Sequence, residues 1–152
     1  MIRVQAEPFD TAAELGRLKR GRSDIGGTAI FVGTMRDLSD GTPISAMTLE
    51  HYPGMTEKAL AEIDDVAHRR WPLLDTLIVH RYGTLKPGED IVLVIATSTH
   101  REAAFAACQF LIDWLKTKAP FWKLEQGPQG DNWVAAKTSD DESAVRWDKA
   151  AS

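Results

Sequence analysis

The sequence predicts an α+β domain with a mixed or mostly antiparallel sheet and flanking helices. Segments with the 3.6-residue period of an amphipathic helix interleave with short alternating or wholly apolar segments typical of strands. Several connections between consecutive strands are short, and a short turn requires antiparallel pairing. The chain has 152 residues, enough for one domain with a real core and too few for two. We therefore expect residues 1–152 to form a single domain.

The expected strands are recognised by alternation or by continuous apolar runs, bounded by turn residues. They cover residues 2–6, 27–35, 47–51, 77–82, 91–96, 121–125 and 133–136. The run at 91–96 is apolar throughout, which predicts a central strand covered on both faces. Gly33, near the end of the second strand, lacks a Cβ and lets another group approach the backbone closely.

Three amphipathic helices are expected, over residues 11–20, over 55–70, and from just after Thr99 to just before Pro120. Thr11 and Thr99 each precede a glutamate by three residues, the pattern of a capping box. Proline cannot continue a helix, so Pro72 and Pro120 end the second and third helices. The last segment, about 139–152, is an acidic tail in which we expect one short helix near Val145 and Trp147.

The expected core includes Cys108, which shares an apolar helix face with Phe105, Ile112 and Leu115. Met47, Trp114 and Trp122 are also most simply core residues. Cys108 is accordingly interpreted as a packing residue and not as a reactive thiol.

Composition excludes several functional classes. The net charge is −4, whereas domains that bind nucleic acid without sequence preference carry a basic surplus. No apolar run approaches the ~20 residues needed to span a bilayer, and the first residues lack the layout of a signal peptide. A single cysteine cannot form an internal disulfide, which fits a reducing compartment, so we expect a cytoplasmic protein. The histidines lack metal-ligand spacing, and we expect no metal.

Two lysines on either side of Pro120 are the first candidates for chemistry. The chain bends between Lys116 and Lys123, so two ammonium groups seven residues apart can converge on one site. Their apolar and aromatic neighbours favour partial desolvation, which lowers the pKa of a lysine and suits it to acid–base work. The alternative is a pair of ordinary solvated lysines near a helix C-terminus, where positive charge is favourable.

His100 and Arg101 lie in the expected first turn of the long helix. Positive charge is unfavourable at a helix N-terminus unless an anion is bound there, so the pair indicates an anion site. Alternatively, both residues pair with Glu102 or another acid. The helix rises about 24 Å from His100 to Lys116. If both ends serve one small substrate, that site lies between two copies of the chain.

Arg36 ends a strand and is followed by the polar loop 37–43, a usual place for a guanidinium that grips a substrate. The alternative is a plain surface arginine.

These residues fall within five short blocks that occur in a fixed order along the chain. The blocks are Phe31–Arg36, Leu49–Met55, His80–Gly83, Ser98–Arg101 and Lys116–Lys123. Together the blocks resemble the large, catalytic subunit of molybdopterin synthase, and the resemblance extends from about Val4 to Trp147. One block would be weak support, but five in order with natural spacing are specific.

The resemblance implies an α/β hammerhead fold and a homodimer at the core of a heterotetramer, with a small ubiquitin-like subunit at each end. It also implies a sulfurtransferase. Two sulfurs pass to cyclic pyranopterin monophosphate and form the dithiolene of molybdopterin. Each sulfur arrives as a thiocarboxylate on the C-terminal Gly-Gly of the small subunit. No cofactor is implied beyond the substrate itself.

The resemblance also implies roles for individual residues. It places catalysis on Lys116 and Lys123. It places substrate binding on Thr34, Met35, Arg36, His100, Arg101, Leu124 and Glu125. Lys137 stands where some relatives are expected to have arginine, and a lysine keeps the charge but loses the bidentate grip. Asp37 and Asp40 put negative charge beside a pocket meant for an anion.

Two non-enzymatic alternatives remain open from the residues. One is a sensor that binds a phosphate ligand at the helix N-terminus, and the other is a dimeric scaffold that docks a ubiquitin-like partner. A sensor needs cations but no lysine of tuned pKa, and a scaffold needs neither.

Overall fold

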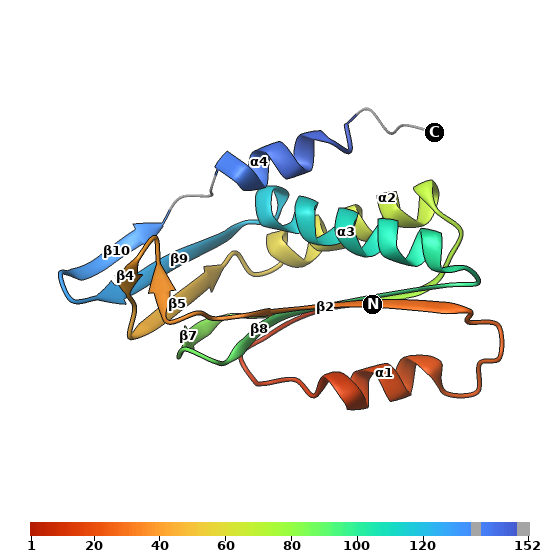
Figure 1. The fold of residues 1–152 in the computed structure, drawn as a ribbon, viewed down its shortest axis with the longest axis horizontal. Coiled ribbons are helices and arrows are strands. Elements are labelled where there is room, and N and C mark those ends of the chain that lie inside the picture. Colours follow the sequence, from red (N-terminus) through yellow and green to blue (C-terminus); the bar gives the residue numbers. More distant parts are fainter. Residues whose placement is uncertain (135–137, 149–152) are drawn as a thin grey trace.

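The computed structural model describes residues 1–134 and 138–148, and its centre is a four-stranded main sheet (Figure 1). The strands of this sheet follow the order β1-β6-β8-β2 and span Ile2–Gln5, Leu73–Arg81, Asp90–Ser98 and Gly27–Thr34. β1 runs parallel to β6, and the other neighbours are antiparallel. The predicted α+β class with a mixed sheet is confirmed.

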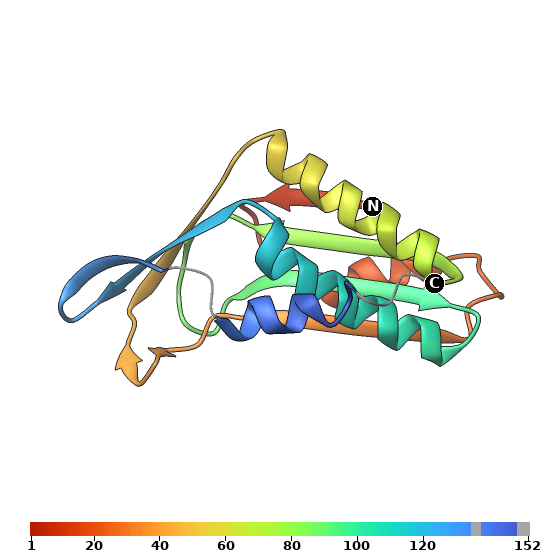
Figure 2. The same cartoon turned by 90° about the horizontal axis from the view of Figure 1, so that it is seen from above.

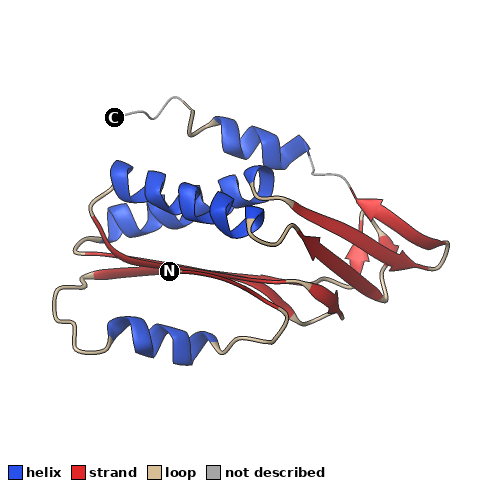
Figure 3. Ribbon diagram, turned by 180° about the vertical axis from the view of Figure 1, so that it is seen from behind, coloured by secondary structure: helices blue, strands red, loops and turns tan. Residues whose placement is uncertain are grey.

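Helices cover both faces of the main sheet (Figures 1 and 3). On one face lies α1 (Thr11–Lys19), and on the other lie α2 (Met55–Arg70) and α3 (Arg101–Lys118). β8 is buried from Val92 to Ser98 and contributes to the apolar clusters on both sides, as its unbroken apolar sequence predicted. Within the described part of the chain, no helix has the length and apolar character needed to span a membrane.

A second sheet extends from one end of the main sheet (Figures 1 and 2). Its strands follow the order β10-β9-β5-β7 and span Gly130–Val134, Phe121–Gly127, Ala46–His51 and Gly83–Leu85. All three pairings are antiparallel. A small two-stranded ribbon, β3 (Leu38–Ser39) with β4 (Thr42–Pro43), occupies the predicted polar loop. Asp40 and Gly41 turn this ribbon with φ values of 49° and 80°.

Both predicted capping boxes are wrong. The N-cap of α1 is Asp10, whose Oδ1 accepts a hydrogen bond from the backbone N–H of Ala13 at 3.0 Å. The N-cap of α3 is His100, which makes no capping bond through its side chain. In each helix the extended residue that precedes the first turn lies one position away from the threonine, and a cap requires that backbone geometry.

Two aromatic residues expected in the core are exposed. Phe105 is 65% exposed, because it lies off the face of α3 that packs on the sheet. Trp122 is 47% exposed on the outer face of β9. Cys108 and Met47 are buried as expected, and Trp114 packs against the main core.

The acidic C-terminal segment folds back onto α3. The helix α4 (Thr138–Val145) begins earlier than predicted and lies over α3 (Figure 1). Trp147 packs edge-on against Trp71 and Phe110, and its indole N–H donates to Asp113 Oδ2 at 2.7 Å. Residues 149–152 lie outside the described part.

Candidate active site

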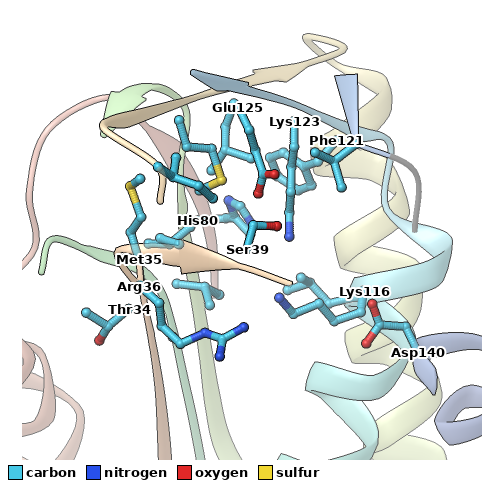
Figure 4. A pocket seen from close by; sticks show the side chains of 18 of the residues that line it. Thr34, Met35, Arg36, Ser39, His80, Lys116, Phe121, Lys123, Glu125 and Asp140 are labelled. Carbon is cyan, nitrogen blue, oxygen red and sulfur yellow. The ribbon is translucent and has the colours of Figure 1, made fainter. Parts of the chain in front are cut away.

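A cavity of about 280 Å³ lies where the end of the main sheet, the C-terminus of α3 and the second sheet meet (Figure 4). Its polar lining comes from distant parts of the sequence: Thr34, Arg36, Ser39, His80, Lys116, Lys123, Glu125 and Asp140. Its apolar lining includes residues of the small core beneath the second sheet: Met35, Ile44, Met47, Leu49 and Ile91. A cavity with apolar walls and a few convergent charged groups is the usual form of a small-molecule site.

The break at Pro120 brings the two lysines to this cavity. Lys116 lies in the last turn of α3, and the carbonyl of Pro120 accepts a hydrogen bond from Thr56 Oγ1 at 3.0 Å. That bond ties the link between α3 and the following strand to the start of α2, and it is one of the contacts that orient this strand. The predicted convergence of Lys116 and Lys123 is confirmed, since both line the cavity. Lys123 is half-buried, whereas Lys116 is exposed in the single chain.

Alternation along β9 decides which of its side chains enter the cavity. Phe121, Lys123 and Glu125 line it, as the two-residue period predicts. Leu124, expected among the substrate-binding residues, lies with Trp122 on the opposite face, so its side chain is not part of this cavity. Lys123 is held from both sides, because β9 pairs with β5 and with β10 at that position.

Arg36, the second residue after β2, also lines the cavity. The preceding residue, Met35, is buried, and its backbone is fixed at both groups: its N–H donates to Glu89 O at 2.9 Å and its carbonyl accepts from Gly88 N–H at 2.8 Å. The backbone that leads into Arg36 is therefore rigid, although the Arg36 side chain is exposed. Gly33 is tightly packed, since a Cβ there would lie 2.6 Å from Val92 Cγ1.

Asp140 lines the same cavity and was treated in the sequence only as part of an acidic tail. It reaches the site because α4 folds back over α3, a contact that no local pattern indicates. The described lining thus has three cations, Arg36, Lys116 and Lys123, against two carboxylates, Glu125 and Asp140. Lys137 lies outside the described residues.

His80 is the lining residue whose importance the sequence did not indicate. It lies near the end of β6 with only 6% of its surface exposed, and its ring stacks on Phe121 with centroids 3.7 Å apart. Its Nδ1 lies 2.8 Å from the carbonyl oxygen of Arg81, which can only accept, so Nδ1 carries the proton. Burial, together with the charges of Lys116 and Lys123, lowers the pKa of His80 from 6.5 to about 3. The ring is neutral in the folded protein.

The lowered pKa of His80 makes stability depend on pH. Between pH 6.5 and about 3 the unfolded chain binds a proton at His80 that the folded chain does not, so stability falls as the pH falls through this window. We expect this group to contribute a slope of up to about 1.4 kcal/mol per pH unit, and we expect His80→Phe to lose that contribution. Urea unfolding of both proteins between about pH 6.5 and 5 measures the difference. Equal slopes for the two proteins would contradict the buried, neutral state of His80.

His100 and Arg101 lie at the other end of α3. They line a separate hollow with Gly26, Thr99, Glu102 and Phe105. The start of β2 packs tightly against this helix end, since a Cβ on Gly27 would lie 2.8 Å from Arg101 Cα. As the length of α3 predicted, one chain does not bring this pair to Lys116.

Few of the side chains that the structure describes are suited to carrying sulfur or binding a metal ion. The lone cysteine, Cys108, is buried, and burial raises its pKa to about 11, so its thiol stays protonated and inert. Among the described residues, no group of three or more His, Cys, Asp or Glu side chains is placed to hold a metal ion.

The fold and the cavity define a class: an α+β protein with a cationic, partly apolar pocket suited to an anionic small molecule. Comparison with known families matches residues 4–118 to the family described as MoaE protein. A Ralstonia nicotianae protein named molybdopterin synthase catalytic subunit is 55% identical over 96% of this chain and 83% of its own length. The chain therefore belongs to the MoaE family, and it is an enzyme of molybdenum cofactor biosynthesis.

Solved structures agree with this assignment. The molybdopterin biosynthesis MoaE protein of Burkholderia ambifaria has a TM-score of 0.84 and 51% identity, with 97% of each chain covered. A complex of subunits 1 and 2 of molybdopterin-converting factor from Helicobacter pylori has a TM-score of 0.71 over 90% of each chain. At 19% identity, that second likeness concerns the fold alone. The predicted resemblance and fold are confirmed.

Proposed function

We propose that this chain transfers sulfur from a thiocarboxylate on a small partner subunit to cyclic pyranopterin monophosphate, which forms the dithiolene of molybdopterin. Each transfer converts one thiocarboxylate to a carboxylate, with water supplying the oxygen that replaces the sulfur, so two carriers supply the two sulfurs. The proposal needs no metal or organic cofactor. The reaction belongs in the cytoplasm, which fits a chain whose single cysteine forms no internal disulfide.

One observation carries the proposal: a chain of the MoaE family gathers Arg36, Lys116 and Lys123 around one cavity. The substrate phosphate and the thiocarboxylate are both anions, and converging cations stabilise both. The buried Cys108 is unsuited to carrying sulfur, so the sulfur has to come from a partner.

The two lysines take different parts in the proposed reaction. Lys116, at the end of α3, is exposed in the single chain and meets the incoming thiocarboxylate, where it assists proton transfer. Lys123, half-buried on β9, holds the substrate and stabilises the negative charge that develops as sulfur attacks. The backbone from Thr34 to Arg36 and the Glu125 side chain complete the pocket.

The proposed assembly is a homodimer with one small ubiquitin-like subunit at each end. The Helicobacter pylori relative of this fold is a complex of two different subunits, which supports a small partner here. The separation of His100 and Arg101 from Lys116 along α3 supports a second copy, whose pair would complete the pocket. Phe105, beside Arg101 and largely exposed, is a residue that such a copy would cover.

The direct test mixes the purified chain with a thiocarboxylated small subunit and cyclic pyranopterin monophosphate, and then measures dithiolene formation. We expect product only when all three components are present. If the chain binds the pyranopterin but forms no dithiolene, the phosphate sensor is favoured. Binding of the small subunit alone would favour the scaffold.

The anion-binding residues provide a further prediction. Arg36→Ala and Arg101→Ala should each weaken binding of cyclic pyranopterin monophosphate by roughly tenfold to over a hundredfold, because a hydrogen bond to a charged group contributes about 1.5–3 kcal/mol. Calorimetric titration measures this change. Arg69→Ala, which removes an exposed cation of α2 outside both hollows, is the matched control. Affinities within twofold of wild type in both variants would make Arg36 and Arg101 ordinary surface arginines.

A further inference from the structure

A pair of stacked rings lies where the main sheet and the second sheet meet. β6 lies between β1 and β8 in the main sheet, and β9 lies between β10 and β5 in the second sheet. His80 of β6 and Phe121 of β9 stack across this boundary, with centroids 3.7 Å apart and ring planes 19° from parallel. Both side chains line the cavity (Figure 4).

The histidine side of this stack is rigid. Its Nδ1–H donates to the carbonyl of Arg81, and the Arg81 side chain is itself tied down. The guanidinium donates to Ala6 O at 3.0 and 3.1 Å and to Asp90 O at 3.2 Å. His80 therefore presents a fixed face to Phe121.

The histidine ring in this stack is uncharged. Lys116, Lys123 and His51 are the groups whose charges act on His80, and all three disfavour its protonated form. Burial acts in the same direction and is the largest influence on its pKa. A neutral imidazole can thus share the cavity lining with two lysines without repelling either of them.

The stack also bears on where the lysines point. Phe121 shares the cavity face of β9 with Lys123, two residues further on. Lys116 instead belongs to α3, which packs on the main sheet. The relative placement of the two ammonium groups therefore depends on how the second sheet is held against the main sheet, and the His80–Phe121 stack lies at that junction.

We propose that His80 is a positioning residue of this enzyme: its ring, fixed to β6 and stacked on Phe121, holds β9 so that Lys123 faces Lys116. The expected effect of His80 on turnover rests on the proposed sulfur transfer. The effect of His80 on the placement of the two lysines is independent of that proposal and can be measured separately.

The first measurement is a cross-link between the two lysines. The full chain is treated with a short amine-reactive cross-linker, and the joined Lys116–Lys123 peptide is quantified by mass spectrometry. We expect His80→Ala to lower the yield severalfold and His80→Phe, which keeps a flat ring against Phe121, to restore most of it. Phe121→Leu removes the other ring and should lower the cross-link yield as much as His80→Ala does. The test can therefore still be made if one of these two variants fails to fold.

The matched control is Val79→Ala. Val79 is the neighbour of His80 on β6, is fully buried, and faces the opposite apolar cluster near α1. Its truncation disturbs the same strand without touching the stack, so the cross-link yield should stay near that of wild type. If Val79→Ala lost the cross-link as strongly as His80→Ala, His80 would contribute only general packing, and the proposal would be overturned.

The second measurement is kinetic. Misplacement of a reacting group by about 1 Å can cost about a hundredfold in rate. We expect kcat of His80→Ala to fall by roughly that factor with KM for the pyranopterin little changed, and His80→Phe to recover most of kcat. Unchanged cross-link yield in His80→Ala, or no recovery in His80→Phe, would overturn the proposal. A cross-link lost while kcat stays normal would support the positioning and contradict the catalytic role of the lysines.

Discussion

A Lys116→Ala variant is expected to lose at least about a hundredfold in turnover while remaining folded. Proton transfer by a positioned side chain contributes about 10²–10⁴ to a rate, and Lys116 reaches the cavity from the end of α3. Its side chain is exposed, so truncation should change the free energy of unfolding by no more than about 0.5 kcal/mol. Single-turnover dithiolene formation and urea unfolding measure the two quantities.

Three further variants test the same assignment. Lys116→Arg keeps the positive charge but cannot give up its proton, so it should retain substrate binding and still lose turnover. Lys118→Ala is the matched control, because its ammonium lies over the Trp114 ring at 4.6 Å, outside the cavity lining. Lys123→Ala should also be severely impaired. Near-normal activity of a folded Lys116→Ala protein would refute the catalytic assignment and favour the sensor or the scaffold.

Mixing two inactive variants should restore activity. At substrate concentrations well below saturation, Arg101→Ala and Lys116→Ala proteins are each expected to be nearly inactive alone. If every site takes Lys116 from one protomer and Arg101 from its partner, a mixed dimer has one site with both lesions and one site with none. The physical reason is the length of α3, which keeps Arg101 and Lys116 of one chain at opposite ends of the helix.

The expected recovery of activity follows from the fraction of intact sites in the mixture. Random exchange of equal amounts makes half of the dimers mixed, and half of their sites are intact, so activity should reach about a quarter of wild type. Mixed dimers carrying two different affinity tags can be isolated, which removes any doubt about exchange. If isolated mixed dimers stayed as inactive as the parents, each site would belong to one chain, and Arg101 would need a purely structural explanation.

The local geometry of the lysine pair follows from the residues around Pro120. Pro120 ends α3 because it lacks an N–H, and the two-residue period of the following strand then puts Lys123 and Glu125 on one face. These effects act over a few residues, so they can be read from the chain. The same period places Leu124 on the outer face of β9, away from the cavity.

The length of α3 can also be predicted from the sequence, because a helix rises about 1.5 Å per residue whatever its tertiary contacts. This length alone places Arg101 and Lys116 of one chain far apart. Helix caps were less predictable: Asp10, and not Thr11, caps α1, since one residue of difference in backbone geometry selects the cap.

Which distant residues join the lysines depends on how the whole chain packs. Asp140 enters the cavity because α4 and Trp147 pack on α3. His80 looks isolated in the sequence, 41 residues from Phe121, and acquires its neutral state from burial and from two lysines that reach it through other elements. Burial and the charge of neighbours are properties of the assembled core, and no pattern of nearby residues encodes them.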